Sequence, residues 1–185
     1  MRNVILFIAM SLDGYIADRD GGVGWLNGQG DGGQVPDSYS EFVRGIDTVL
    51  MGWNPCHQVV TELSPGEWVY GDFTTYVLTH REAESSENIR FTDEAPAVLV
   101  RRLKEEPGKD IWVCGGAGLV RQLMEEDLID GYYISVIPTV LGDGIRLFPG
   151  GVREIPLRLS RTRDYYGIVE LVYERRKREG RLQDD

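Results

Sequence analysis

The sequence has little cysteine and histidine, and these deficits exclude several kinds of site. Its two cysteines, Cys56 and Cys114, stand far apart, the first beside a proline and the second in an apolar segment. Neither a disulfide framework nor a Cys-x-x-Cys metal motif is present. The two histidines, His57 and His80, have no partners at metal-ligand spacing, so we expect no metal site. A Gly-x-Ser-x-Gly elbow, which would indicate a serine hydrolase, is also missing.

Basic residues are outnumbered by acidic ones. The chain has 20 Lys and Arg against 30 Asp and Glu, which gives a formal net charge of -10 at pH 7. Binding to nucleic acid requires clustered Lys and Arg that neutralise phosphates. We therefore expect no nucleic-acid partner.

Long apolar runs are absent too. No segment approaches the roughly 18 apolar residues that a membrane helix needs, so we expect no membrane partner. The apolar run at 4–10 continues directly into Ser11-Leu12-Asp13-Gly14 without a signal-peptide cleavage pattern. We interpret this run as a buried strand and predict a cytoplasmic protein.

What the sequence does contain is typical of one globular domain. The chain has 185 residues, of which 42% are hydrophobic and 27% charged. We assign residues 1–175 to the domain and 176–185 to a charged tail without a core face. Buried-strand patterns at 4–10, 48–51, 75–79, 111–114 and 132–137 alternate with helix signals, which favours an α/β fold with a mainly parallel sheet. Paired strands at 157–166 and 168–175 predict a C-terminal antiparallel hairpin.

The strongest local signal is Gly115-Gly116-Ala117-Gly118, between a buried strand and an amphipathic helix. Glycines allow close backbone approach, and a helix start offers unpaired N–H groups and a favourable dipole to phosphate oxygens. A pyrophosphate would fit there. A double glycine after a strand can equally be a tight turn.

Two other strands end in comparable segments. Gly52-Trp53-Asn54-Pro55 follows one strand, and Asn54 could cap a short helix there. Thr79-His80-Arg81 ends another with groups suited to ribose or phosphate. Each segment alone is more often an ordinary turn or polar loop. Ligands of such sheets bind beyond the carboxyl ends of the strands, so the coincidence of three such ends favours a nucleotide site.

Four motifs in a fixed order resemble a known family. They are Ser11-Leu12-Asp13-Gly14-Tyr15-Ile16-Ala17, Val49-Leu50-Met51-Gly52, Val113-Cys114-Gly115-Gly116-Ala117-Gly118-Leu119, and Pro138-Thr139-Val140-Leu141-Gly142-Asp143-Gly144 with Leu147-Phe148-Pro149. Over residues 2 to about 175 the chain resembles the dihydrofolate reductase superfamily, in the branch that includes the reductase domain of bifunctional riboflavin-biosynthesis deaminase-reductases. The resemblance implies a dihydrofolate-reductase-like mixed, mainly parallel eight-stranded sheet flanked by helices, with NADPH across the strand ends. Independently of the resemblance, Asp13-Gly14 favours a turn in which Asp13 is the cap and Gly14 takes a positive φ.

The resemblance also implies which residues contact each part of the cofactor. Position by position, these are Gly52, Trp53 and Asn54 near the adenosine phosphates, Thr79 and His80 near the adenine ribose, Gly115, Gly116, Ala117, Gly118 and Leu119 under the pyrophosphate, Ala9, Ile16 and Ala17 beside the nicotinamide, and Arg81 as a charge near the 2′-phosphate.

Trp53 departs from the family pattern, which usually has Met-Gly-Arg-x-Thr-Tyr with an arginine that contacts the 2′-phosphate. A guanidinium offers bidentate charged hydrogen bonds, whereas an indole offers one N–H and a stacking face. Trp53 could stack on adenine, and NADH could replace NADPH unless Arg81 takes over the role.

The substrate side has weaker sequence signals. In dihydrofolate reductases a buried carboxylate early in the first helix holds the pterin, and a hydroxyl on a later strand hydrogen-bonds it. Spacing from the Met-Gly motif makes Asp37 the corresponding catalytic carboxylate, Ser135 the hydroxyl and Trp25 an indole that lines the pocket. Asp37 could equally be a helix N-terminal residue stabilised by the dipole, Ser135 could pack between strands, and Trp25 could anchor a loop. Glu41 is a second carboxylate candidate.

The resulting hypothesis is an NAD(P)H-dependent oxidoreductase. Hydride would pass from C4 of the reduced nicotinamide to a C=N or C=O carbon of a small planar, pterin- or pyrimidine-like substrate. The glycine-rich segment 18–33 resembles a mobile loop that closes over such sites. Between residues 13 and 41 Arg19 is the only cation, which disfavours a ribosyl phosphate substrate.

Two further hypotheses concern turnover and assembly. A non-catalytic nucleotide-binding homologue would keep the fold without turnover, and Trp53 would permit it. Relatives are often dimers, and Tyr165, Tyr166 and Tyr173 could form an interface, so we expect a homodimer, although these rings may belong to the core.

Overall fold

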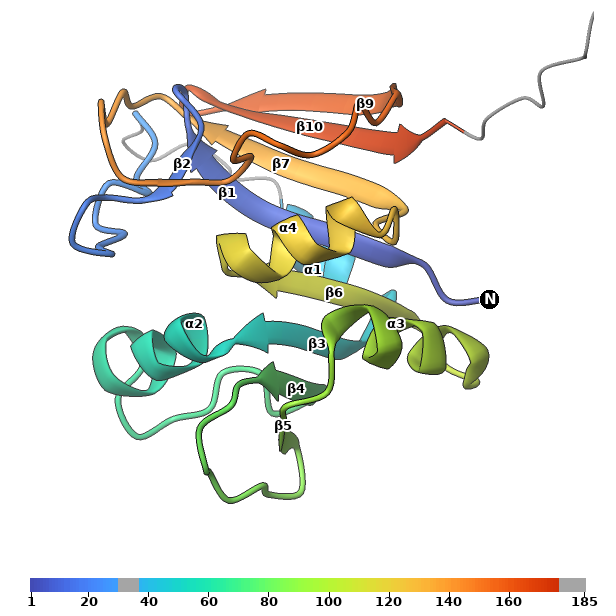
Figure 1. Ribbon diagram of the computed structural model, residues 1–185. Helices are drawn as coiled ribbons and strands as arrows, with labels where there is room; N and C mark the ends of the chain where they lie inside the picture. Colours follow the sequence, from blue (N-terminus) through green and yellow to red (C-terminus); the bar gives the residue numbers. More distant parts are fainter. Residues whose placement is uncertain (30–36, 177–185) are drawn as a thin grey trace, which may run out of the picture.

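A mixed eight-stranded sheet organises the chain in the computed structural model, which describes residues 1–29 and 37–176 (Figure 1). The strand order is β5-β4-β3-β6-β1-β7-β10-β9. The bounds are β1 Val4–Ser11, β3 Ile46–Gly52, β4 Thr74–Leu78, β5 Ile89–Thr92, β6 Asp110–Gly115, β7 Gly131–Ile137, β9 Leu157–Tyr165 and β10 Ile168–Arg175. Neighbours from β5 to β7 are parallel, whereas β10 pairs antiparallel with β7 and β9. The predicted mainly parallel sheet with a C-terminal antiparallel hairpin is confirmed.

Helices cover the two faces of this sheet unequally. Helices α3 (Pro96–Glu105) and α4 (Ala117–Glu125) pack on one face, where Leu103 and Leu123 belong to the same buried cluster as Val4 and Leu6 of β1. Helices α1 (Ser38–Val43) and α2 (Trp53–Gln58) lie on the other face, and a π-helical turn (Val59–Leu63) continues α2. Because successive strand residues point to opposite faces, Ile5 of β1 belongs to this second cluster. Beyond α1, this second face of β7 and β10 carries a pocket.

A small second sheet pairs β2 (Tyr15–Ala17) with β8 (Ile145–Arg146). It joins the first of the sequence motifs to the fourth. These two strands and β5 have only two to four residues each, which is too short for a periodic pattern, and the sequence did not predict them.

The end of α1 and the start of α2 differ from what the sequence suggests, and the predicted cap at Asn54 was wrong. Ile46 stands at helical spacing from Phe42 in the sequence but begins β3, because a turn from the Gly45 N–H to the Phe42 carbonyl ends α1 first. Its side chain still packs in the same cluster as Phe42, which explains the helix-like spacing. Asn54 lies inside α2, whose N-cap is Gly52 with extended backbone and no side-chain capping bond.

Of the charged tail predicted at 176–185, only Arg176 lies within the described residues. Over 1–29 and 37–176 no helix combines the length and apolarity that crossing a bilayer demands. The same residues contain no cluster of His, Cys, Asp and Glu side chains arranged to hold a metal ion.

Candidate active site

Two helix N-termini meet at the carboxyl ends of neighbouring strands β3 and β6. Gly52 caps α2 and Gly116 caps α4, both in extended backbone and both without a side-chain cap. A Cβ added to Gly52 would lie 3.8 Å from the Gly116 backbone nitrogen, so the two caps almost touch. The first N–H groups of each helix have no partner within the helix, and their dipoles favour an anion between them.

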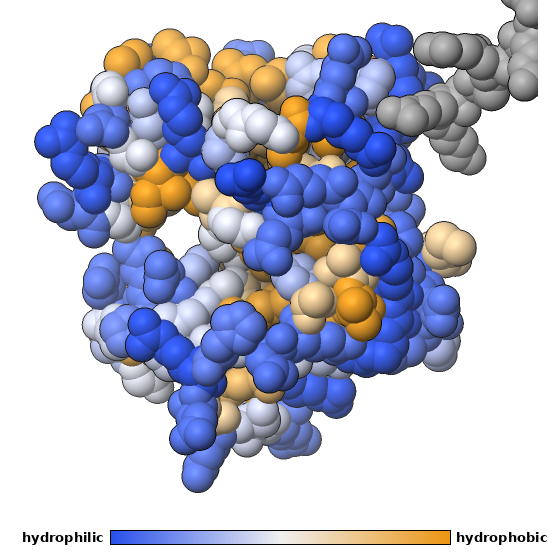
Figure 2. Space-filling view, viewed as in Figure 1, coloured by the Kyte–Doolittle hydropathy of each residue, from blue (hydrophilic) through white to orange (hydrophobic). Residues whose placement is uncertain are grey.

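A pocket of 530 Å³ opens beside these caps, and Figure 2 shows the molecule hollowed between the β2–β8 region and α2. Residues predicted to contact the cofactor come together around it: Ile16, Ala17, Gly52, Asn54, Gly116, Ala117, Gly118 and Leu119. Ile145 of β8 and residues Asp20, Gly21, Pro55, His57, Gln58 and Glu62 complete the lining. No Arg or Lys of the described residues is among them, so backbone N–H groups are the main source of positive potential.

A second pocket, of 380 Å³, lies at the carboxyl ends of β4 and β5, and Thr79 and His80 line it. Nearby, the Arg81 guanidinium lies over the Trp53 ring, 5.2 Å from its centroid. The backbone N–H of Arg81 donates to the Thr79 hydroxyl at 3.1 Å. Trp53, at the position where the family usually has an arginine, therefore packs against the guanidinium of Arg81.

Asp13 has the structural role that the sequence predicted. It accepts a hydrogen bond from the Ser11 hydroxyl (2.6 Å) and from the backbone N–H groups of Leu141 (3.1 Å) and Gly142 (2.8 Å). These bonds, the one from Ser11 foremost, lower the pKa of Asp13 to about 2. Gly14 has a φ of 90°. The turn fastens the loop of the fourth motif next to the end of β1.

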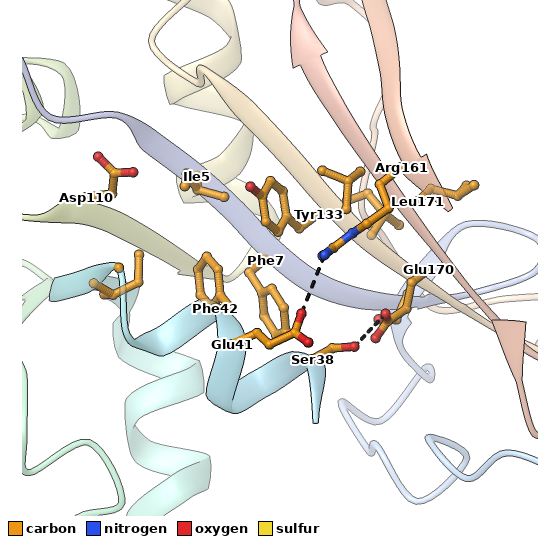
Figure 3. A pocket seen from close by; sticks show the side chains of 15 residues that line it. Ile5, Phe7, Ser38, Glu41, Phe42, Asp110, Tyr133, Arg161, Glu170 and Leu171 are labelled. Atoms are coloured by element: carbon orange, nitrogen blue, oxygen red, sulfur yellow. Dashed lines mark hydrogen bonds and ion pairs between the residues drawn. The ribbon is translucent and has the colours of Figure 1, made fainter. Parts of the chain in front are cut away.

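A separate pocket of 360 Å³, which shares no lining residue with the first, lies between α1 and strands β1, β7 and β10 (Figure 3). Phe7 of β1 and Phe42 of α1 stack in its wall, with ring centroids 4.2 Å apart and planes 10° apart. Tyr133 of β7 lines it as well. Ser135, the predicted substrate hydroxyl, is among the lining residues.

The buried carboxylate of this pocket is Glu170 of β10, which the sequence did not identify. Its side chain is 8% exposed and accepts hydrogen bonds from the hydroxyls of Ser38 (2.7 Å) and Tyr165 (2.8 Å). Glu170 is also the cross-strand partner of Ser135. The one available signal was its place in the period-two alternation of β10, which normally indicates a solvent-facing position.

Asp37 and Trp25 lie elsewhere. Asp37 is the N-cap of α1, exposed, and its carboxylate accepts the Ser40 backbone N–H at 3.1 Å. Hydrogen bonding by Ser40 lowers the pKa of Asp37. The Trp25 indole donates to the Gly22 carbonyl at 3.1 Å and so anchors its own loop. Neither side chain lines the 530 Å³ pocket at the helix caps or the 360 Å³ pocket beside α1, whereas Glu41 lines the pocket beside α1.

The strand order, the paired helix caps and the pocket under α1 together define a dihydrofolate-reductase-like α/β protein. Comparison with known proteins makes the assignment more specific. Residues 2–167 match the model of the RibD C-terminal domain, and the chain belongs to that family. The sequence-based resemblance is therefore confirmed.

The relatives cover almost the whole chain. The uncharacterized protein YwjB of Bacillus subtilis (strain 168) is 42% identical over 178 residues, which are 94% of this chain and 98% of YwjB. The uncharacterized protein YyaP of the same strain is 32% identical over 183 residues, 93% of this chain and 94% of YyaP.

Solved structures share the fold at lower identity. A protein from Shewanella sp. PV-4, named as a putative riboflavin biosynthesis protein, superimposes with a TM-score of 0.82 at 24% identity, over 95% of this chain and 99% of its own. A diaminohydroxyphosphoribosylaminopyrimidine deaminase/5-amino-6-(5-phosphoribosylamino)uracil reductase from Thermotoga maritima superimposes with a TM-score of 0.69 at 18% identity. That match covers 94% of this chain and 56% of the Thermotoga chain.

Proposed function

We propose that this chain is an NAD(P)H-dependent reductase that transfers a hydride to a C=N or C=O carbon of a small planar substrate. The observation that carries the proposal is the meeting of the α2 and α4 N-termini at one pocket. The family, and the reductase activity in the name of the Thermotoga protein, agree with it.

The pocket residues fit a dinucleotide diphosphate. Gly116 and the first turn of α4 present backbone N–H groups without side-chain caps, and a Cβ built on Gly118 meets no atom within 4 Å. A phosphate oxygen can therefore approach the backbone there as closely as a hydrogen bond requires. The reduced dinucleotide, when bound, supplies the hydride, while the protein contributes position and exclusion of water.

NADPH is the dinucleotide that we favour. Arg81, held over Trp53, is an exposed guanidinium near the strand end expected to receive the adenosine half. Such a group forms charged hydrogen bonds with a 2′-phosphate. NADH would suit the site if Arg81 makes no such contact.

Titration of the purified chain with NADPH and with NADH in a thermal-shift assay tests this function. At a concentration of 100 Kd a ligand stabilises the folded state by about 2.7 kcal/mol. For a domain of this size that corresponds to a rise in Tm of about 5–11 °C. No shift with either dinucleotide would overturn the proposal. Binding without oxidation of the dinucleotide by any of a panel of planar C=N and C=O compounds would favour a non-catalytic nucleotide-binding protein.

A further inference from the structure

Three residues on neighbouring strands form one row that leads from the predicted nicotinamide position to Glu170. Ala9 of β1 is the register partner of Ser135 of β7, which in turn is the partner of Glu170 of β10. Partners in register point to the same face of a sheet, and strands lie about 4.8 Å apart. The backbone of Glu170 therefore lies about 10 Å from that of Ala9, across two strand spacings. This distance matches the width of a fused two-ring system.

Glu170 is a buried carboxylate that forms no ion pair with the described Lys and Arg side chains. Its cross-strand neighbour Arg163 instead donates to the Ser38 hydroxyl, at 3.3 Å. Among the ion pairs of residues 1–29 and 37–176, none involves Glu170, and its neighbours Ser38 and Tyr165 are neutral donors. Burial raises the pKa of Tyr165 to about 12, so its hydroxyl remains protonated and able to donate. A buried charge is stable only when its lone pairs are satisfied. Each carboxylate oxygen has two acceptor positions, and one bond to each leaves room for a ligand.

The charges and the shape of the pocket restrict what that ligand can be. Glu41, Asp110 and Glu170 line it together with a single guanidinium, Arg161, which is already paired with Glu41 at 3.5 Å (Figure 3). Arg163, just outside the lining, also pairs with Glu41, at 2.9 Å. Carboxylates therefore outnumber guanidiniums, which disfavours a phosphate group. The stacked rings of the wall favour a flat ligand.

We propose that Glu170 anchors the substrate, and that this substrate is an unphosphorylated planar heterocycle whose edge presents N–H groups to the Glu170 carboxylate. Ser38 and Tyr165 are positioning residues, because each holds one carboxylate oxygen in place. The assignment of this ligand as the substrate rests on the proposed reductase function. The anchoring of an N–H edge by Glu170 can be tested without it.

Isothermal titration with three probes tests the proposal. The probes are 2-aminobenzimidazole, which has an N–H edge on two fused rings, 2-methylbenzoxazole, which has similar size and no N–H, and ribose 5-phosphate. We expect wild-type protein to bind 2-aminobenzimidazole more tightly than either other probe. Glu170→Gln should weaken that binding about ten- to a hundredfold, the value of a hydrogen bond to a charged group. Glu174→Gln, the same change at an exposed position of β10, should leave it unaltered.

Equal affinity of wild type and Glu170→Gln for 2-aminobenzimidazole, no binding of it by wild type, or preference for ribose 5-phosphate would each overturn the proposal. If Glu170→Gln does not fold, Tyr165→Phe carries the test, with an expected loss of about two- to tenfold for one neutral hydrogen bond. NADPH affinity, measured in the same variants, should stay within twofold of wild type, which a general loss of structure would not permit. Failure of both NADPH and NADH to bind wild type, with the probe result intact, would refute the reductase function and leave the anchoring role of Glu170 standing.

Discussion

Gly118→Ala should change stability and cofactor binding in opposite directions. Gly118 lies in the first turn of α4, and an added Cβ meets no protein atom within 4 Å. Alanine in a helix is more favourable than glycine by about 0.5–1 kcal/mol. The ligand-free variant should therefore melt about 1–4 °C above wild type.

The same methyl group would occupy the space that a diphosphate needs. Crowding of this kind costs about 1–3 kcal/mol, which is about a 5- to 150-fold loss of NADPH affinity. Thermal melts without ligand and calorimetric titration with NADPH measure the two effects. Gly150→Ala is the control, because a Cβ there also meets nothing within 4 Å and the residue lines none of the three pockets described above. A raised Tm with a Kd within twofold of wild type would refute the diphosphate position.

Three further predictions concern the loop of the fourth motif, the turn at Asp13 and the adenosine end. Gly144→Ala places a Cβ against the Ala17 carbonyl oxygen and should lower the free energy of unfolding by about 2–5 kcal/mol. In Gly142→Ala the Cβ meets no atom within 4 Å, so only the left-handed backbone is strained and the loss should be about 1–2 kcal/mol. Urea unfolding measures both values. The pKa of Asp13 is lower in the folded state than in the unfolded state, so the Asp13 carboxylate stabilises the fold above about pH 4 and loses this effect as the pH falls through about 2. Between pH 5 and pH 2 the Tm of wild type should therefore fall further than the Tm of Asp13→Asn. Parallel curves of Tm against pH for the two proteins would contradict this prediction. Arg81→Gln should weaken NADPH binding about tenfold and leave NADH binding unchanged, and an equal loss for both dinucleotides would exclude a 2′-phosphate contact.

Local signals in the sequence were enough to predict the architecture. The alternation of strand and helix patterns predicted the parallel sheet. Gly52 and Gly116 lie at the carboxyl ends of strands, where sheets of this kind bind ligands. The small β2–β8 sheet could not be foreseen, because it depends on pairing between segments about 130 residues apart.

The substrate side depended on contacts that no local pattern encodes. Asp37 and Ser38 are adjacent, but the first is the exposed cap of α1 whereas the second is buried and points to Glu170, 132 residues away in sequence. In the sequence, the apolar residues Val169, Leu171 and Tyr173 alternate with polar or smaller neighbours, which indicates that these three face the core and that Glu170 faces solvent. The structure reverses this pattern, because Glu170 and Val172 are buried whereas Leu171 is only partly buried and Val169 is exposed.

A structure of the chain in complex with NADP⁺ would test the central claim most directly. We expect diphosphate oxygens about 2.7–3.2 Å from backbone nitrogens in the first turn of α4, and the nicotinamide ring beside Ala9, facing Ser135 and Glu170. A diphosphate bound away from the α2 and α4 caps, or a nicotinamide remote from Ala9, would contradict it.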